Sequence, residues 1–232
     1  MSTQGPGPLI VSIEGNIGAG KTTIIEQMQK QMESDKIIFL REPVDLWESI
    51  KDPADGESIL VKFYKDPVKY AFSFQVMAYA TRLSMIKDII QKNPQCDMII
   101  CERSLDADKN IFAKMLHEDG VINNVEFQIY NKFYKEYSEN YKLSKIIYID
   151  ADPEVCAKRI HTRNRTGESG IELDYLQKCQ RFHTKWLCEK DEFHADTQLL
   201  HIKTNEHATY NKDDAADCGN EWIRQIQSFI AL

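Results

Sequence analysis

Short apolar runs alternate along the chain with longer segments in which apolar residues recur at helical spacing. The runs are nearly continuous, which is typical of strands buried on both faces of a parallel sheet. They predict strands at Leu9–Ile13, Lys36–Leu40, Met98–Cys101, Lys145–Ile149 and Leu199–Ile202. The segments between them predict helices at Lys21–Glu33, Glu57–Tyr64, Val68–Gln91, Asp106–Leu116, Val125–Tyr141, Pro153–Arg163, Leu173–Leu187 and Glu221–Ala231. This alternation predicts one doubly wound α/β domain.

Composition is consistent with a globular domain. The chain has 232 residues, of which 42 % are hydrophobic and 28 % charged. A chain of this length can bury a large core without disulfides or a structural metal. We therefore expect a single domain over residues 9–232. The preceding residues 1–8, which end in two Gly-Pro pairs, predict a flexible tail rather than a signal peptide.

The net charge and the cysteine content limit which binding partners and which cellular compartment we expect. The net charge of −7 argues against a broad nucleic-acid-binding face. No apolar run approaches the ~20 residues of a membrane span. The six cysteines include no C-x-x-C pair, and without a secretory signal they predict reduced thiols. We expect a cytoplasmic protein that binds neither nucleic acid nor membrane.

A phosphate-binding loop follows the first predicted strand. The segment Gly15-Asn16-Ile17-Gly18-Ala19-Gly20-Lys21-Thr22 matches G-x-x-x-x-G-K-[ST] and is followed by Thr23 at the start of a predicted helix. Glycines allow backbone N–H groups to surround phosphate oxygens at a helix N-terminus, where the dipole favours negative charge. Lys21 would bridge the β- and γ-phosphates and the Thr22 hydroxyl would bind Mg²⁺. The loop predicts binding of a nucleoside triphosphate.

The metal needs a second oxygen ligand, and two carboxylates follow predicted strands. Glu102 comes after the third strand and Asp150 after the fourth. Periodicity does not separate them. Glu102 is favoured because Arg103 and Ser104 follow it directly, whereas Asp150 precedes Ala151-Asp152-Pro153, which is typical of helix capping.

Three further motifs, Glu42-Pro43-Val44, Phe72-Ser73-Phe74-Gln75 and Glu102-Arg103-Ser104, occur in order after the loop. With them the chain, from Leu9 to Leu187, resembles the deoxyribonucleoside kinases, in particular the deoxycytidine and deoxyguanosine kinase branch. The resemblance implies a three-layer P-loop kinase fold with a central five-stranded parallel sheet and an arginine-bearing lid at about residues 159–171. It also implies a homodimer formed through the helices at 68–91 and 125–141.

The implied activity is Mg²⁺-dependent transfer of the γ-phosphoryl group of ATP, or another nucleoside triphosphate, to the 5′-hydroxyl of a deoxyribonucleoside. Glu42 follows the second predicted strand, at the sheet edge where ligands of open α/β sheets bind. In the resembling family this Glu is the base, and Arg103 would hold it in place. Arg159 and Arg163 share one helical face, and with Arg165 they would neutralise the transferring phosphoryl group.

The resemblance also implies a nucleoside pocket. Tyr64 and Glu168 match the residues that hold the sugar 3′-hydroxyl. Gln75 offers a donor and an acceptor to a base edge. Walls would come from Trp47, Phe74 and Phe112. Arg82 and Asp108 would pair near the base, which favours deoxycytidine, deoxyadenosine or deoxyguanosine over thymidine.

Two departures from the family leave details open. Met77 stands where deoxycytidine kinase relatives carry a larger aromatic residue, so the base is not fixed. Lys203-Thr204-Asn205-Glu206 has no close match to the family's donor-base loop, so the donor is open. A nucleoside monophosphate kinase and a non-catalytic nucleotide-driven switch remain as alternatives.

Overall fold

The computed structural model describes residues 7–32, 34–165, 168–189, 197–211, 213–214 and 216–231. The predicted tail at residues 1–8 therefore falls mostly outside the described residues. So do Thr166 and Gly167 of the predicted lid.

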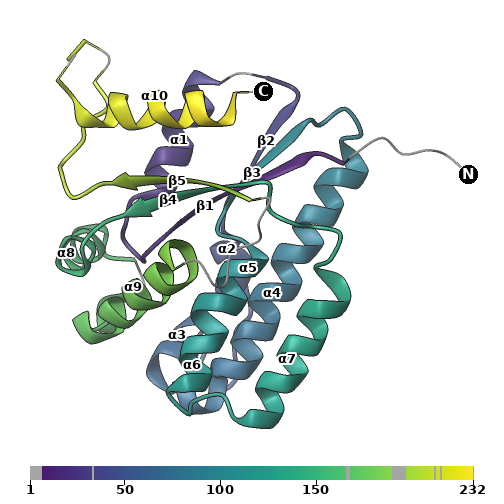
Figure 1. The fold of residues 1–232 in the computed structure, drawn as a ribbon. Coiled ribbons are helices and arrows are strands. Elements are labelled where there is room, and N and C mark those ends of the chain that lie inside the picture. The colour runs from purple at the N-terminus through teal and green to yellow at the C-terminus, as the bar shows by residue number, and fades with distance from the viewer. Residues whose placement is uncertain are drawn as a thin grey trace, which may run out of the picture.

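The centre of the molecule is a five-stranded, entirely parallel sheet (Figure 1). Its strands are β1 (Leu9–Gly15), β2 (Ile37–Leu40), β3 (Met98–Glu102), β4 (Lys145–Asp150) and β5 (Gln198–Lys203). Their order across the sheet is β2-β3-β1-β4-β5. The predicted α/β architecture is confirmed, and all five strand ends meet at one edge.

Helices cover both faces of this sheet. They are α1 (Lys21–Gln31), α2 (Val44–Ser49), α3 (Ile59–Lys65), α4 (Pro67–Lys92), α5 (Leu105–Ala107), the π-helix η1 (Asp108–Ala113), α6 (Lys114–Glu118), α7 (Asn124–Tyr137), α8 (Pro153–Arg163), the 3-10 turn η2 (Glu168–Gly170), α9 (Leu173–Cys188) and α10 (Cys218–Ile230). Figure 1 shows α1 and α10 on one face and α4, α7 and α9 on the other.

Each face has its own apolar core, because neighbouring positions in a strand point to opposite sides. Val11 and Ile147 are fully buried with Ile25 of α1 and Ile226 of α10. On the opposite face Ile99 is fully buried in the core that includes residues of α4 and α7. Near-continuous apolar strands are thus explained by burial on both sides.

One predicted helix differs in kind from the observed structure, and one observed helix was not predicted. The predicted helix Asp106–Leu116 is α5, η1 and α6 in succession, with a π-helical turn at Asp108–Ala113. The short helix α2 was not predicted, because six residues give too little periodicity to detect.

Other helices differ at their ends. The helix predicted at Val125–Tyr141 stops at Tyr137 and begins at a capping box formed by Asn123 and Glu126. The C-terminal helix begins at Cys218, three residues earlier than predicted, because Asp217 caps it.

Two other expectations concern the state of the cysteines and the presence of a membrane-spanning segment. All six cysteines are free, and four of them are buried. Within the described residues, no helix has the length and apolar character needed to cross a membrane.

Candidate active site

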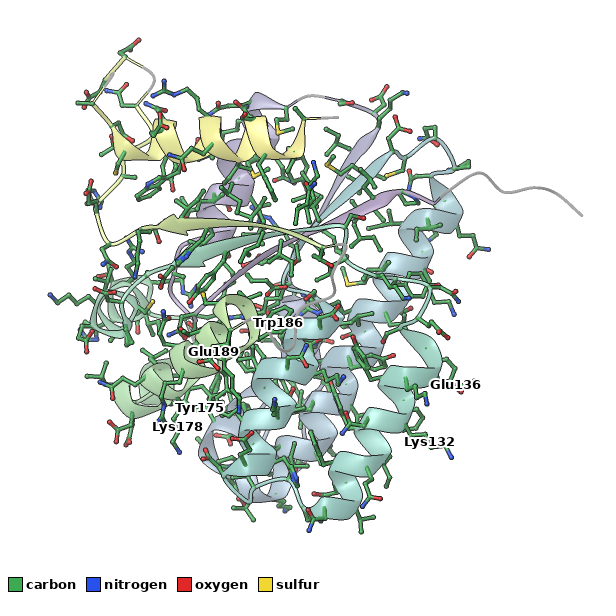
Figure 2. All side chains as sticks on the ribbon, in the orientation of Figure 1. Lys132, Glu136, Tyr175, Lys178, Trp186 and Glu189 are labelled. Carbon is green, nitrogen blue, oxygen red and sulfur yellow. The ribbon has the colours of Figure 1, made fainter. Side chains whose placement is uncertain are left out.

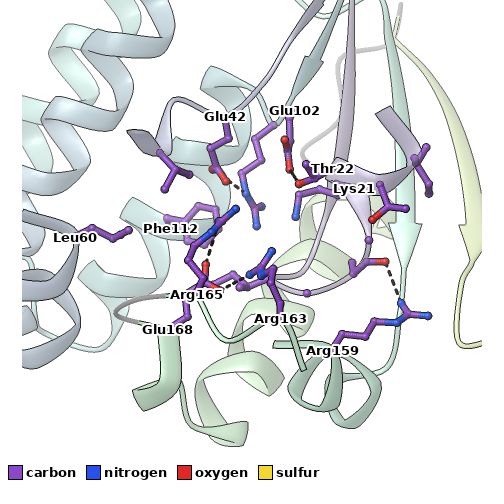
Figure 3. A pocket seen from close by; sticks show the side chains of 18 of the residues that line it. Lys21, Thr22, Glu42, Leu60, Glu102, Phe112, Arg159, Arg163, Arg165 and Glu168 are labelled. Atoms are coloured by element: carbon purple, nitrogen blue, oxygen red, sulfur yellow. Dashed lines mark hydrogen bonds and ion pairs between the residues drawn. The ribbon is translucent and has the colours of Figure 1, made fainter. Parts of the chain in front are cut away.

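The carboxyl edge of the sheet opens into a cavity of about 800 Å³, within the size range of small-molecule sites. Most of the predicted site residues line it, as Figure 3 shows from close by. They are Ile17, Gly18, Ala19, Gly20, Lys21, Thr22, Thr23, Glu42, Trp47, Tyr64, Phe74, Gln75, Glu102, Arg103, Asp108, Phe112, Arg159, Arg163, Arg165 and Glu168. Gly15, Asn16 and Arg82 lie behind the lining.

The phosphate-binding loop has the geometry of an anion cradle. Gly18 and Gly20 have φ of 80° and 101°, in the left-handed region that favours glycine. A Cβ atom on Gly18 would lie 2.6 Å from the carbonyl oxygen of Cys156. Asn16 fixes the loop from behind by donating to the carbonyl of Leu176 at 2.8 Å. The loop is therefore pre-shaped at the start of α1.

Lys21 is the buried cation of this cradle. Its Nζ donates to the carbonyl oxygens of Gly15 (3.2 Å) and Asn16 (2.9 Å). Burial and the charge of Arg103 lower the pKa of Lys21 to about 8, although Glu102 and Glu42 oppose the shift. A desolvated ammonium group at this position favours a polyanionic ligand.

The two candidate metal carboxylates have different surroundings in the structure. Thr22 Oγ1 donates to Glu102 Oε1 at 2.6 Å (Figure 3). Asp150 is instead held by His201, Lys203 and Gln180, at 2.7, 2.7 and 2.6 Å. A hydroxyl and a carboxylate oxygen side by side fit Mg²⁺, which usually binds one or two protein oxygens together with phosphates and water. Among the described residues no cluster of three or more metal-binding side chains occurs.

Glu42 lies beside two arginines. Its Oε1 is 3.3 Å from Arg103 Nε and 3.5 Å from Arg82 Nη2, and its side chain is 20 % exposed. Burial alone would raise the pKa of Glu42, but the charges of Arg103, Arg82 and Lys21 outweigh burial and hold it below its ordinary value. Glu42 is thus an ionised carboxylate facing the cavity.

The predicted pair of Arg82 and Asp108 is present. Arg82 Nε donates to Asp108 Oδ2 at 2.9 Å, and Nη1 donates to the carbonyl of Glu102 at 2.7 Å. Arg82 is 1 % exposed and is absent from the cavity lining, whereas Asp108 reaches the cavity. Arg82 therefore orients the carboxylates of Asp108 and Glu42 from a position outside the cavity lining.

Aromatic side chains form one end of the cavity. Phe63 and Phe74 stack with ring centroids 4.7 Å apart, and Trp47 meets Phe74 edge-on at 5.4 Å. Trp47 is fixed by a hydrogen bond from Nε1 to Thr81 Oγ1 at 3.1 Å. The Gln75 side chain, only 3 % exposed, also borders this end.

The predicted lid arginines have two kinds of partner. Arg163 and Arg165 both pair with the buried Glu168 (Figure 3). Arg159 instead donates to three backbone carbonyls, those of Ala19 (3.1 Å), Thr204 (2.7 Å) and Glu206 (2.9 Å). It therefore connects α8 to the phosphate-binding loop and to the segment after β5.

Sequence reasoning missed several lining residues. Tyr175 of α9 and Phe63 of α3 line the cavity, and Phe63 stacks on Phe74. Tyr210 and Trp222 also line it and pack edge-on against each other. None belongs to a motif, and aromatic residues at helical spacing are typical of a core as well. The helical pattern alone gives no signal for them.

Comparison with known proteins identifies the family of the chain. A sequence model of the family described as deoxynucleoside kinase matches residues 11–230. The probable deoxycytidine kinase of fowlpox virus (strain NVSL) is 37 % identical over 194 residues, which cover 83 % of this chain and 77 % of that protein. Human deoxycytidine kinase is 29 % identical, over 99 % of this chain and 94 % of the relative. The mitochondrial deoxyguanosine kinase of Xenopus laevis is 28 % identical, over 95 % and 89 %. The chain belongs to the deoxynucleoside kinase family and is a deoxynucleoside kinase.

Proposed function

We propose that the protein transfers the γ-phosphoryl group of ATP, or another nucleoside triphosphate, to the 5′-hydroxyl of deoxycytidine, deoxyadenosine or deoxyguanosine. The observation that carries this proposal is the position of Glu42. Its carboxylate, paired with Arg103, lines the same cavity as the phosphate-binding loop. An acceptor hydroxyl bound at Glu42 would face the terminal phosphoryl group of a nucleotide on that loop.

Glu42 accepts the proton of the 5′-hydroxyl and aims its oxygen at phosphorus. Orientation matters more than basicity in this reaction, because phosphoryl transfer depends mainly on positioning and charge neutralisation. Arg103 holds Glu42 and keeps one buried nitrogen, Nη1, without a hydrogen-bond partner among the described residues.

The donor phosphates are bound by the loop amides and Lys21. Thr22 and Glu102 are the proposed Mg²⁺ ligands. The metal would neutralise charge on the phosphate oxygens. Arg163 and Arg165 carry positive charge into the same cavity, where it would stabilise the charge spread over the transferring group.

The nucleoside occupies the aromatic end in this proposal. Gln75 meets the base with its amide donor and acceptor, and Asp108, oriented by Arg82, accepts from an exocyclic amino group. Tyr64 and Glu168 bind the sugar 3′-hydroxyl. Trp47, Phe74 and Phe112 enclose the ring. A carboxylate near the base favours the three amino-bearing bases over thymine.

The two alternatives fit the cavity less well. A monophosphate acceptor would bring its phosphate close to the Glu42 carboxylate, which is repulsive. A nucleotide-driven switch needs no acceptor pocket, which would leave the ordered Gln75, Asp108 and Arg82 without a ligand.

We also propose that two copies associate through α4 and α7. Val125, Ile129, Phe133 and Tyr137 recur every fourth residue along α7 and are 42–65 % exposed. Such a stripe is typical of a contact surface. Figure 2 shows Lys132 and Glu136 of the same helix on the outside of the molecule.

The cytoplasmic location stays a prediction from the sequence.

The function is tested by incubating the protein with ATP, Mg²⁺ and each of the four deoxynucleosides or their monophosphates, and by separating the products chromatographically. We expect 5′-monophosphates from deoxycytidine, deoxyadenosine or deoxyguanosine. Turnover of monophosphates alone would support the monophosphate kinase, and turnover of no acceptor would support the switch.

A double substitution tests which residues select the base. Replacing the pair together, as Arg82→Met with Asp108→Ala, removes the buried charges at the base without leaving one unpaired. We expect the ratio of kcat/KM for thymidine to that for deoxycytidine to rise at least about tenfold. An unchanged preference order would remove the pair from base selection.

A further inference from the structure

Arg103 has an unusual backbone conformation. Its φ is 63°, in the left-handed region that non-glycine residues rarely adopt. A non-glycine residue in this region is strained and persists only where its surroundings fix it. Here the turn directs the side chain: the guanidinium lies 3.3 Å from Glu42 at Nε and 4.7 Å from the ring centroid of Phe112.

The neighbours of Arg103 hold this turn on both sides. Its own backbone N–H donates to the carbonyl of Ile13 in β1 at 3.1 Å. The next residue, Ser104, donates from Oγ to Glu14 Oε1 at 2.6 Å and accepts from the N–H of Ala107 at 3.0 Å. One hydroxyl therefore joins the turn to β1 and also caps α5.

Burying a carboxyl group at position 14 carries a desolvation cost. It is fully buried in β1, immediately before the phosphate-binding loop, where an apolar side chain would avoid the desolvation of a carboxyl group. Its Oε2 has no hydrogen-bond partner within the described part of the chain. Burial raises the pKa of Glu14, and the Ser104 hydrogen bond opposes that shift. Glu14 Oε1 accepts the hydrogen bond from Ser104 Oγ, and this contact joins β1 to the turn after β3.

We propose that Glu14 is a positioning residue for phosphoryl transfer: through its hydrogen bond to Ser104 it holds the turn that aims the Arg103 guanidinium at Glu42. This inference rests on the proposed function of Glu42. Because Glu14 and Gly15 are adjacent, the same carboxyl group ties the acceptor-aligning turn to the strand that carries the donor loop. Displacing a reacting group by ~1 Å can cost about a hundredfold in rate, so the contact controls turnover without touching substrate.

The test is a double-mutant cycle in the full chain with Glu14→Ala, Ser104→Ala and both together. ATP, Mg²⁺ and the deoxynucleoside that the wild type phosphorylates fastest are the substrates. We expect each single variant to lower kcat about tenfold and the double variant to lower it little further, since both remove one contact. The deoxynucleoside KM should stay within about threefold, because the base and sugar contacts lie elsewhere.

Two further variants separate positioning from general destabilisation. Glu14→Gln keeps an oxygen acceptor of the same shape and should retain kcat within about threefold of the wild type. Ser138→Ala removes another buried serine hydroxyl, which bonds Tyr79 at 3.0 Å outside the cavity, and should leave kcat within about twofold. If Glu14→Ala does not fold, Ser104→Ala, which removes a single oxygen atom, still decides the question.

Any of three results would overturn the proposal. The losses in kcat could multiply in the double variant, or Ser104→Ala could keep a near-wild-type kcat. The third is a Glu14→Gln variant as slow as Glu14→Ala. A wild type that phosphorylates no deoxynucleoside would refute the proposed function instead. In that case a crystal structure of Ser104→Ala is the remaining test. Departure of Arg103 from positive φ supports the positioning contact, and an unchanged turn overturns it.

Discussion

At the scale of single residues, the site depends on how Glu42 stays ionised in a largely buried position. Four cations, Arg103, Arg82, Lys21 and Arg165, together outweigh the effect of burial and hold the pKa of this carboxyl group down. The same arrangement keeps the carboxylate ready to accept a proton while limiting its rotation. The residue-level chemistry therefore depends on side chains from α1, α4 and the turn after β3 as well as on Glu42 itself.

This arrangement predicts how stability depends on pH. A carboxylate with a depressed pKa in the folded state stabilises the protein fully above its unfolded pKa, near the ordinary 4.5. That contribution is lost as pH falls through the folded pKa. The difference in free energy of unfolding between wild type and Glu42→Gln, measured by urea denaturation, should be constant above pH 5 or so and shift against the wild type as pH falls below 4.5. A difference that shifts in favour of the wild type on acidification would contradict the account.

At the scale of elements, the site is assembled by short irregular segments on a regular sheet. The π-helical turn η1 brings Asp108 and Phe112 to the cavity from one segment. Such turns often occur at functional sites. Arg159 similarly connects α8 with two loops through three carbonyl oxygens. We propose that Arg159 organises the donor end rather than acting on the transferring phosphoryl group, because its guanidinium already holds these carbonyls.

Arg159→Lys tests that interpretation, because a single ammonium group cannot hold three carbonyls in one plane. We expect the KM for ATP to rise about tenfold with a smaller change in kcat and in the deoxynucleoside KM. Arg224→Lys, an exposed change on α10, is the matched control and should alter neither constant. A fall in kcat at unchanged KM for ATP would show that Arg159 acts on the transferring group.

At the scale of the whole molecule, the fold could be predicted from sequence because strand runs and the glycine loop are local signals. The site could be predicted only in part. Strand order does not distinguish Glu102 from Asp150, because β3 and β4 both border β1. What distinguishes them is the hydrogen bond from Thr22 to Glu102, a long-range side-chain contact. Arg159 binds backbone carbonyls, which carry no residue signature, and Tyr175 belongs to no motif. These parts of the site depend on strand register and long-range contacts, which the pattern of apolar and polar residues does not specify.

The apolar stripe on α7 predicts association of two copies. Phe133→Glu places a charge in the middle of the stripe, where burial in an interface would be costly. We expect the wild type to sediment as a dimer in analytical ultracentrifugation and the variant as a monomer. Arg224→Glu, on the opposite face of the sheet, should leave the dimer intact. A dimer that persists in Phe133→Glu would place the interface elsewhere.

The central claim is that Glu42 acts on the acceptor hydroxyl, and one paired measurement on Glu42→Gln tests it. The amide keeps the shape of the side chain but cannot accept the proton. We expect kcat to fall by about 10²–10⁴-fold. The dissociation constant for the deoxynucleoside, measured by calorimetry, should stay within about threefold of the wild-type value. Activity within a few fold of the wild type at equal binding would contradict it.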